Sequence, residues 1–170
     1  MRQRIVAVAS PIKADVVLPF IKAVKETFRS MMEIPIRRRD IYIKQDYMMF
    51  GEVTGVIGLS GAVSGTCAIS MPGALAIEAV GKMLCEDLGE SYDQQEVRDG
   101  VGEMINMIAG RAKGLLSETP NKFDISLPTI ISGYQHEVFQ RKGALCIVLV
   151  FETKDGQPFT LDLALAQKTR

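Results

Sequence analysis

The segment from Asp93 to Glu118 constrains the fold more than any other part of the sequence. With about 100° of rotation per residue, a helix over this range places its large apolar residues on one side. That apolar set is Val97, Val101, Met104, Ile105, Ile108, Ala112 and Leu115. A second set falls opposite, at steps of four, three, four and three, and we call it the polar stripe: Asp99, Glu103, Asn106, Gly110 and Lys113. The apolar side therefore anchors the helix to a core, and the polar stripe faces out.

The remaining segments surround this helix with strands and two further helices. Helical spacing of apolar residues predicts a helix over 15–32, which Pro35 prevents from continuing, and residues 73–89 predict another. Glycine-bounded runs at 51–61 and 61–72 predict a hairpin. Further strands are expected at 42–46, 123–131, 136–141, 144–152 and 159–166, with a short strand or extended lead-in at 5–9. Pro128 predicts that 123–131 is an edge strand or contains a bulge.

The order helix, strands, helix, helix, strands predicts an α/β fold, a sandwich of long helices on a largely antiparallel sheet. No low-complexity linker divides the chain, so we expect a single domain over residues 1–170.

The charge balance limits the classes of partner. Lys plus Arg equals 20 and Asp plus Glu equals 20, whereas nucleic-acid binding usually draws on a strong basic excess. The run of three arginines at 37–39 is interpreted as a solvated turn before a strand. The apolar stretch 5–9 is too short to span a membrane. We therefore expect neither nucleic acid nor membrane among the partners.

The cysteines point to a reduced compartment. Cys67, Cys85 and Cys146 are far apart and show no CxxC spacing, which predicts mostly buried thiols in a cytoplasmic protein. These thiols and the single His136 do not assemble a metal site, and His136 is expected to be a surface strand residue.

Two details distinguish the polar stripe from an ordinary solvated helix face. Asn106 is a modest helix former in mid-helix, where solvation alone does not require it. Four glycines, at positions 100, 102, 110 and 114, each cost about 1 kcal/mol relative to alanine. Because Gly102, Gly110 and Gly114 lie on or beside the stripe, we expect another protein's backbone to approach closely there.

The spacing of the stripe resembles a known signature. Asp99-x3-Glu103-x2-Asn106, followed by 21 residues and then Pro128, resembles that of the CheC/CheX family of chemotaxis phosphatases. The segments GVGEMINMIAGRAK, SLPTIISG and GVIGLSGAVSGTCAISM are also similar to that family, and the resemblance covers about residues 14–166. CheC-type relatives carry two such helices. The first long helix here has no Glu-x2-Asn, which favours the one-site CheX branch.

This resemblance implies a substrate and roles for the residues. The substrate would be the phospho-aspartate of a CheY-like response regulator, with Asn106 orienting the attacking water and Glu103 docking to the receiver's lysine. Partner-binding roles are expected for Asp99, Gly102, Gly110, Lys113 and Pro128. The Mg²⁺ of the reaction would sit in the receiver's own acidic pocket, so no metal or cofactor is expected on this chain.

Two alternatives share the same exposed stripe. The chain can be a non-catalytic module that binds a receiver domain, or an interaction protein in signalling whose main property is self-association. CheX-like proteins form homodimers through their sheets, so the resemblance also implies a homodimer.

Overall fold

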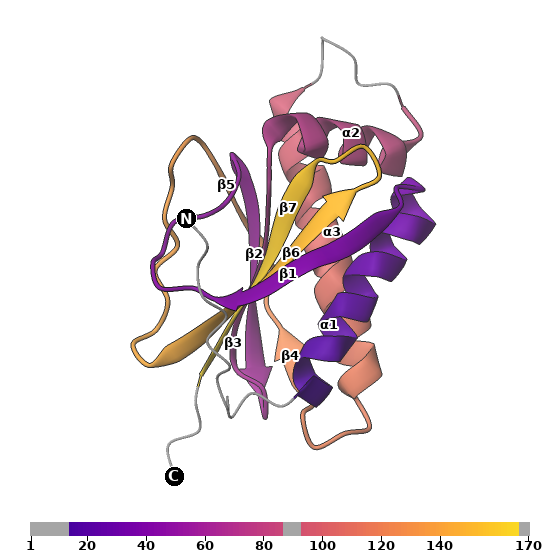
Figure 1. The fold of residues 1–170 in the computed structure, drawn as a ribbon. Coiled ribbons are helices and arrows are strands. Elements are labelled where there is room, and N and C mark those ends of the chain that lie inside the picture. Colours follow the sequence, from indigo (N-terminus) through magenta and orange to yellow (C-terminus); the bar gives the residue numbers. More distant parts are fainter. Residues whose placement is uncertain (1–13, 87–92, 167–170) are drawn as a thin grey trace.

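The computed structural model describes residues 14–86 and 93–166 (Figure 1). Its helices are α1 (Ala14–Thr27), the π-helical turn η1 (Phe28–Met32), α2 (Gly73–Leu84) and α3 (Gln94–Leu116). Its strands are β1 (Ile36–Ile43), β2 (Val53–Gly61), β3 (Gly65–Met71), β4 (Phe123–Ile125), β5 (Thr129–Ser132), β6 (Ala144–Thr153) and β7 (Pro158–Ala166). The predicted lead-in at 5–9 lies outside the described residues.

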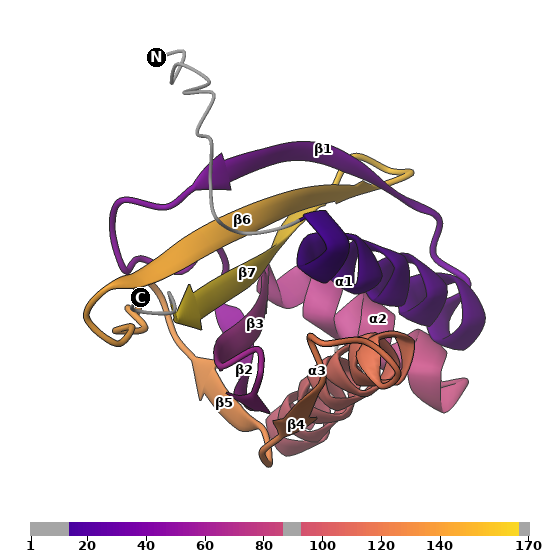
Figure 2. The same ribbon diagram turned by 90° about the horizontal axis from the view of Figure 1, so that it is seen from below.

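A single sheet organises the described residues. Its strand order is β1-β6-β7-β3-β2-β4, with β5 also paired to β2, and all these pairings are antiparallel. The sheet curves around α1 and α3, which lie side by side on one of its faces (Figure 2). The predicted α/β fold of long helices on an antiparallel sheet is therefore confirmed. Within the described ranges, no helix is both long enough and apolar enough to cross a membrane.

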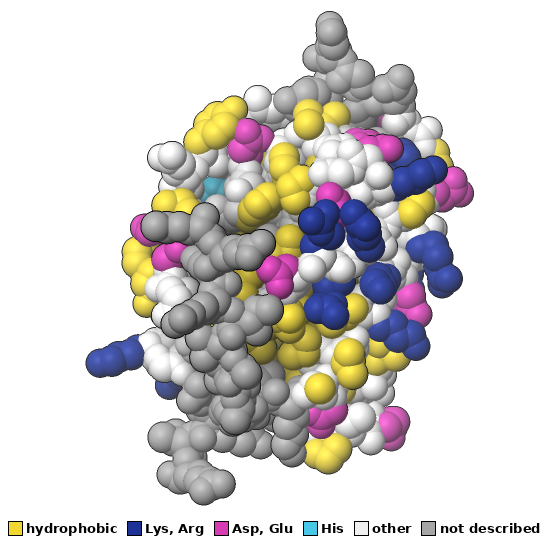
Figure 3. Space-filling model, in the orientation of Figure 1, with side chains coloured by type: hydrophobic (Ala, Val, Ile, Leu, Met, Phe, Trp, Pro, Cys, Tyr) yellow, Lys and Arg dark blue, Asp and Glu magenta, His cyan; other side chains and the backbone are white. Residues whose placement is uncertain are grey.

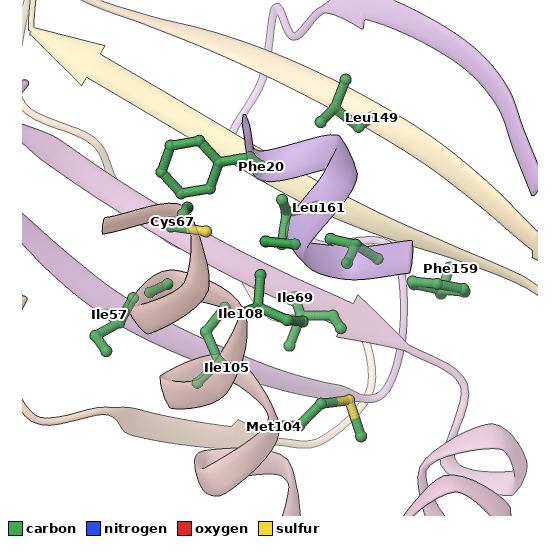
Figure 4. Packing of buried hydrophobic residues seen from close by; sticks show 14 of the residues in the cluster. Phe20, Ile57, Cys67, Ile69, Met104, Ile105, Ile108, Leu149, Phe159 and Leu161 are labelled. Carbon is green, nitrogen blue, oxygen red and sulfur yellow. The ribbon is translucent and has the colours of Figure 1, made fainter. Parts of the chain in front are cut away.

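The main core lies between this sheet face and the helices. Along β6 and β7 every second side chain points toward the helices, as the two-residue period of a strand requires. Phe20 of α1, Ile105 and Ile108 of α3, and Leu149 and Leu161 of the sheet belong to one buried cluster (Figure 4).

The prediction of the apolar side is wrong for one residue. Leu115 is 40% exposed, and its neighbour Leu116 is buried instead. Leu116 continues the buried row of Ile105, Ala109 and Ala112, whereas Leu115 lies beyond the area that α1 and the sheet cover.

Two strand predictions are also corrected. β1 begins at Ile36 rather than at 42, so the three arginines lie inside a strand, where Arg37 and Arg39 both bond to Glu152 of β6. An edge strand exposed to solvent tolerates such a charged run. Residues 136–141 form no strand, apart from one bridge between Glu137 and Met48. The His136 ring instead reaches Thr54 Oγ1 at 2.8 Å, on the sheet face opposite the helices.

The predicted strand 123–131 is divided by a bulge, as Pro128 indicated. β4 and β5 both pair with β2, but the register shifts by one residue between Leu59↔Ile125 and Val56↔Thr129. At the break, Ser126 Oγ accepts the backbone N–H of Gly58 at 2.9 Å, which replaces a ladder hydrogen bond. Ser126 therefore stays bonded to Gly58, whereas Leu127 and Pro128 lie between the two paired flanks without a ladder partner among the described strands.

Helix α3 packs closely on α2 at Gly100. A Cβ atom built at Gly100 would lie 2.5 Å from Cγ1 of Val80, which is buried. A Cβ atom built at Gly114, on the same helix, would have no neighbouring atom within 4 Å. The two glycines therefore have different physical roles, although the sequence alone treats them alike.

We expect Gly100→Ala to lower the free energy of unfolding by about 1–2 kcal/mol, because overpacking outweighs the gain in helix propensity. Gly114→Ala is the matched control, and should raise it by about 1 kcal/mol. Urea denaturation of both variants measures the difference. Equal effects of the same sign would contradict the assigned packing.

The thiols are predicted to differ in reactivity. Cys67 and Cys146 are buried, whereas Cys85 is exposed. Burial, and secondarily the charge of Asp162, raises the pKa of the Cys146 thiol to about 12, and the same causes raise the pKa of Cys67. At about pH 8 neither buried thiol forms the reactive thiolate. An alkylating reagent should therefore add one label, at Cys85, to the native protein and further labels only after unfolding. Mass spectrometry counts them, and rapid native labelling of Cys146 would refute the burial.

Candidate functional site

The polar stripe lies on the part of α3 that the core does not cover. Asp99 and Glu103 are exposed, and Asn106, Gly110 and Lys113 are half-buried. The buried side of the helix faces α1, α2 and strand β2. The 23-residue length of α3 and its packing on three sides give the stripe a rigid support.

The segment 124–130 runs along one flank of the stripe, in the direction opposite to α3. At one end, Lys113 Nζ bonds to Asp124 Oδ1 at 2.7 Å. At the other end, a Cβ built at Gly102 would lie 3.7 Å from Pro128 Cγ and 3.4 Å from Ile130 Cδ1. Ser126 and Leu127 lie in the chain between these contacts, and Asn106 and Gly110 lie on the helix between them. The bulge therefore borders the middle of the stripe.

These contacts correct the expectation for Gly102. The residue is buried, and a Cβ on it would be in van der Waals contact with Pro128 and Ile130 of this chain, so Gly102 faces its own chain rather than a partner's backbone. Gly110, by contrast, has nothing within 4 Å of a Cβ built on it, so its surface is open.

Lys113 is paired within the chain. Its hydrogen bond and its positive charge lower the pKa of Asp124, which favours the ionised carboxylate. Because both groups reach solvent, the pair contributes little to stability, and we assign it to positioning β4 beside α3.

Glu103 and Asn106 differ from the rest of the stripe because their side chains lack partners. Within the part of the chain that the structure describes, neither makes a side-chain hydrogen bond or an ion pair. Asp99 accepts a hydrogen bond from Gln95 Nε2 at 2.8 Å. Residues three apart on a helix have Cβ atoms about 5–6 Å apart, so one ligand can touch both Glu103 and Asn106. Together they offer a free carboxylate for a cation and a free carboxamide that can orient water.

Two apolar features beside the stripe were missed in the sequence. One is Leu127, which directly precedes Pro128 in the bulge and is 89% exposed. On the opposite flank, Met31, Met83 and Met107 come together with Leu84 at the edge of a groove that also contains Glu103. No local sequence pattern shows that three separate elements, η1, α2 and α3, bring these methionines together at the surface.

The described residues contain no group of three or more His, Cys, Asp and Glu side chains that could hold a metal ion. His136, expected on a surface strand, lies half-buried in a loop and away from the polar stripe, with Gly133 and Thr54 as its partners.

Known proteins of similar sequence and similar structure were found for this chain. The curated "CheY-P phosphatase CheX" of Thermotoga maritima is 29% identical over 123 residues, which is 71% of this chain and 77% of the relative. The crystal structure of a chemotaxis protein CheX from Desulfovibrio desulfuricans matches with a TM-score of 0.79 and 29% identity, over 89% of this chain and 99% of that one. The CheX chain of a CheX–CheY–BeF3–Mg²⁺ complex from Borrelia burgdorferi matches with a TM-score of 0.76 and 25% identity, over 91% and 100%.

A family model supports the same assignment from sequence. The model described as chemotaxis phosphatase CheX matches residues 53–152, which include β2, all of α3 and the bulge at Pro128. Because that match spans more than half of the 170 residues, this chain belongs to the CheX family.

Proposed function

We propose that this chain is a phosphatase that hydrolyses the phospho-aspartate of a CheY-like response regulator. The observation that carries the proposal is the pair Glu103 and Asn106, one helical turn apart on α3, free of partners within the described residues. The names of the relatives support it: one is called a CheY-P phosphatase, and another was solved in a complex with CheY.

In the proposed mechanism Asn106 supplies geometry rather than basicity. An acyl phosphate is already activated, so hydrolysis mainly requires a water held in line with the scissile P–O bond. The Asn106 carboxamide can donate to and accept from that water at fixed positions. The half-buried setting of Asn106 beside the bulge limits its side-chain motion, which favours such positioning.

Glu103 has a separate role in the proposal. Its free carboxylate pairs with the receiver's active-site lysine, which sets the orientation of the two proteins. Asp99 and Gly110 contact the receiver on either side, while Pro128 shapes the wall next to Asn106. The Mg²⁺ is proposed to sit in the receiver's acidic pocket, where it would neutralise charge on the phosphoryl group.

Asn106→Ala should lower kcat for dephosphorylation by about 10²–10³-fold, because the water loses its orienting group. Its fold should persist, because the carboxamide makes no hydrogen bond within the described residues. The decay of a ³²P-labelled receiver measures the loss, and Asn121→Ala, on the chain beyond α3, is the matched control. Wild-type decay with Asn106→Ala would refute the catalytic role.

Glu103→Gln should raise KM about tenfold with a smaller change in kcat, because it removes a docking charge and keeps the shape of the side chain. Steady-state kinetics at low and high salt test this, since the wild-type KM should rise with salt and the variant's KM should respond less. Glu118→Gln, an exposed glutamate beyond α3, is the control. An unaltered KM would count against the docking role.

A non-catalytic receiver-binding scaffold would use the same stripe, and the decay assay separates it from the phosphatase. Homodimer formation stays a prediction, and sedimentation equilibrium would measure it.

A further inference from the structure

A groove of about 570 Å³ adjoins the polar stripe on the side opposite the bulge. Its walls are the first half of α3, the end of α2 and the end of η1. The apolar lining consists of Met31, Val80, Met83, Leu84 and Met107. Met31 is 40% and Leu84 44% exposed, so large apolar side chains face solvent there. A concave surface of this kind is typical of protein-binding sites.

The rim of this methionine groove is acidic. Asp93, Glu96, Asp99 and Glu103 line it, and no Lys or Arg belongs to its described lining. Two of these acids have an ordinary explanation: the Asp93 side chain caps α3 through Gln95 N at 2.8 Å, and Glu96 in the first turn favours the helix dipole. Asp99 and Glu103 are in later turns, where neither explanation applies.

The charges of this net-neutral chain are therefore separated over its surface. Lys and Arg side chains gather over α1 and β1, on the face that Figure 3 shows. The groove between these two elements has a mixed charged lining of Lys22, Lys25 and Arg29 together with Glu26 and Glu33, whereas the charged residues of the methionine groove's described lining are all carboxylates. A partner with an apolar, basic surface thus fits the methionine groove better than the groove of mixed charge.

The dimensions indicate the form of that surface. From Glu96 to Met107 the groove follows α3 over 12 residues, a rise of about 16 Å, which is the length of a three-turn helix. Such a helix presents apolar anchors at positions i, i+3 or i+4, and i+7. Methionine side chains are flexible and polarisable, so the groove can adapt to anchors of different shape.

We infer that the receiver which presents its phospho-aspartate to Glu103 and Asn106 also places a basic amphipathic helix in the methionine groove. This inference rests on the proposed function. It is supported by continuity, because Glu103 belongs both to the polar stripe and to the groove's rim. The stripe then performs the chemistry, and the groove contributes affinity and the choice among receivers.

The test uses the full chain and CheY-like receivers of the same organism, loaded with beryllofluoride and Mg²⁺ so that binding is measured without turnover. Leu84→Gln removes an apolar contact, and Glu96→Lys reverses a rim charge. The matched controls are Leu115→Gln, 40% exposed on α3 outside the groove, and Glu118→Lys. Calorimetry gives the affinity, phosphate release gives KM and kcat, and thermal melting verifies the fold.

Leu84→Gln and Glu96→Lys should each weaken binding and raise KM about tenfold, with kcat at saturating receiver unchanged and both controls like wild type. Wild-type affinity in both groove variants would overturn the inference while leaving the phosphatase proposal intact. A groove variant that alters only self-association would also overturn it. If the wild-type chain neither binds nor dephosphorylates any receiver, the proposed function fails first. Loss of turnover in Asn106→Ala, without loss of affinity, separates the stripe's role from the groove's.

Discussion

The close packing of α3 on strand β2 is the contact on which the rest of the structure depends. A Cβ built at Gly55 of β2 would lie 3.1 Å from Ile105 Cγ2, so the helix sits almost directly on the strand's backbone. Ile130 of β5 fills the adjoining space, within 3.4 Å of the constructions at both Gly55 and Gly102. A Cβ at Gly55 would pack tightly against Ile105, whereas a Cβ at Gly102 would be in ordinary van der Waals contact with Ile130, so the helix, β2 and β5 are closely fitted at this point.

This packing explains how a helix with two polar side chains that have no partner among the described residues can serve as a candidate site. Orienting a water with a carboxamide depends on position, since an amide offers no useful basicity at neutral pH. Position is supplied here by the buried side of α3 and by the segment 124–130, which the Lys113–Asp124 pair holds at one end and Pro128 at the other. The bulge between β4 and β5 is what brings Pro128 off the sheet and against the helix.

The separation of charge gives the molecule two different faces. Cations of α1 and β1 gather on one surface, and carboxylates line the groove beside α3. Positive and negative side chains are therefore unevenly distributed, although the formal net charge is zero. The first long helix has no Glu-x2-Asn, and α1 instead exposes Lys22 and Lys25, with Arg29 exposed on η1. The Glu-x2-Asn pair and the carboxylates of the methionine groove thus occur together along α3 and its N-cap.

The sequence by itself determined the features that depend on local periodicity. Spacings within one element predict the α3 helix, the break near Pro128 and the outward direction of Glu103 and Asn106. The order of the elements along the chain predicts the antiparallel sheet. Only the tertiary structure decided which neighbour each face meets. Gly102 and Gly110 are equivalent in sequence, yet β5 covers one and leaves the other open.

Contacts between elements also account for the remaining predictions that were wrong. The arginines at 37–39 join a strand because Glu152 lies opposite them on β6, 113 residues or more along the chain. His136 lies in a loop rather than in the expected strand, and its ring forms a hydrogen bond with the Thr54 hydroxyl of β2. The methionine groove, finally, is formed by three elements that meet only in the folded chain. Contacts between distant residues gain their free energy from burial and from partners that no local spacing encodes, and so they could be known only from the structure.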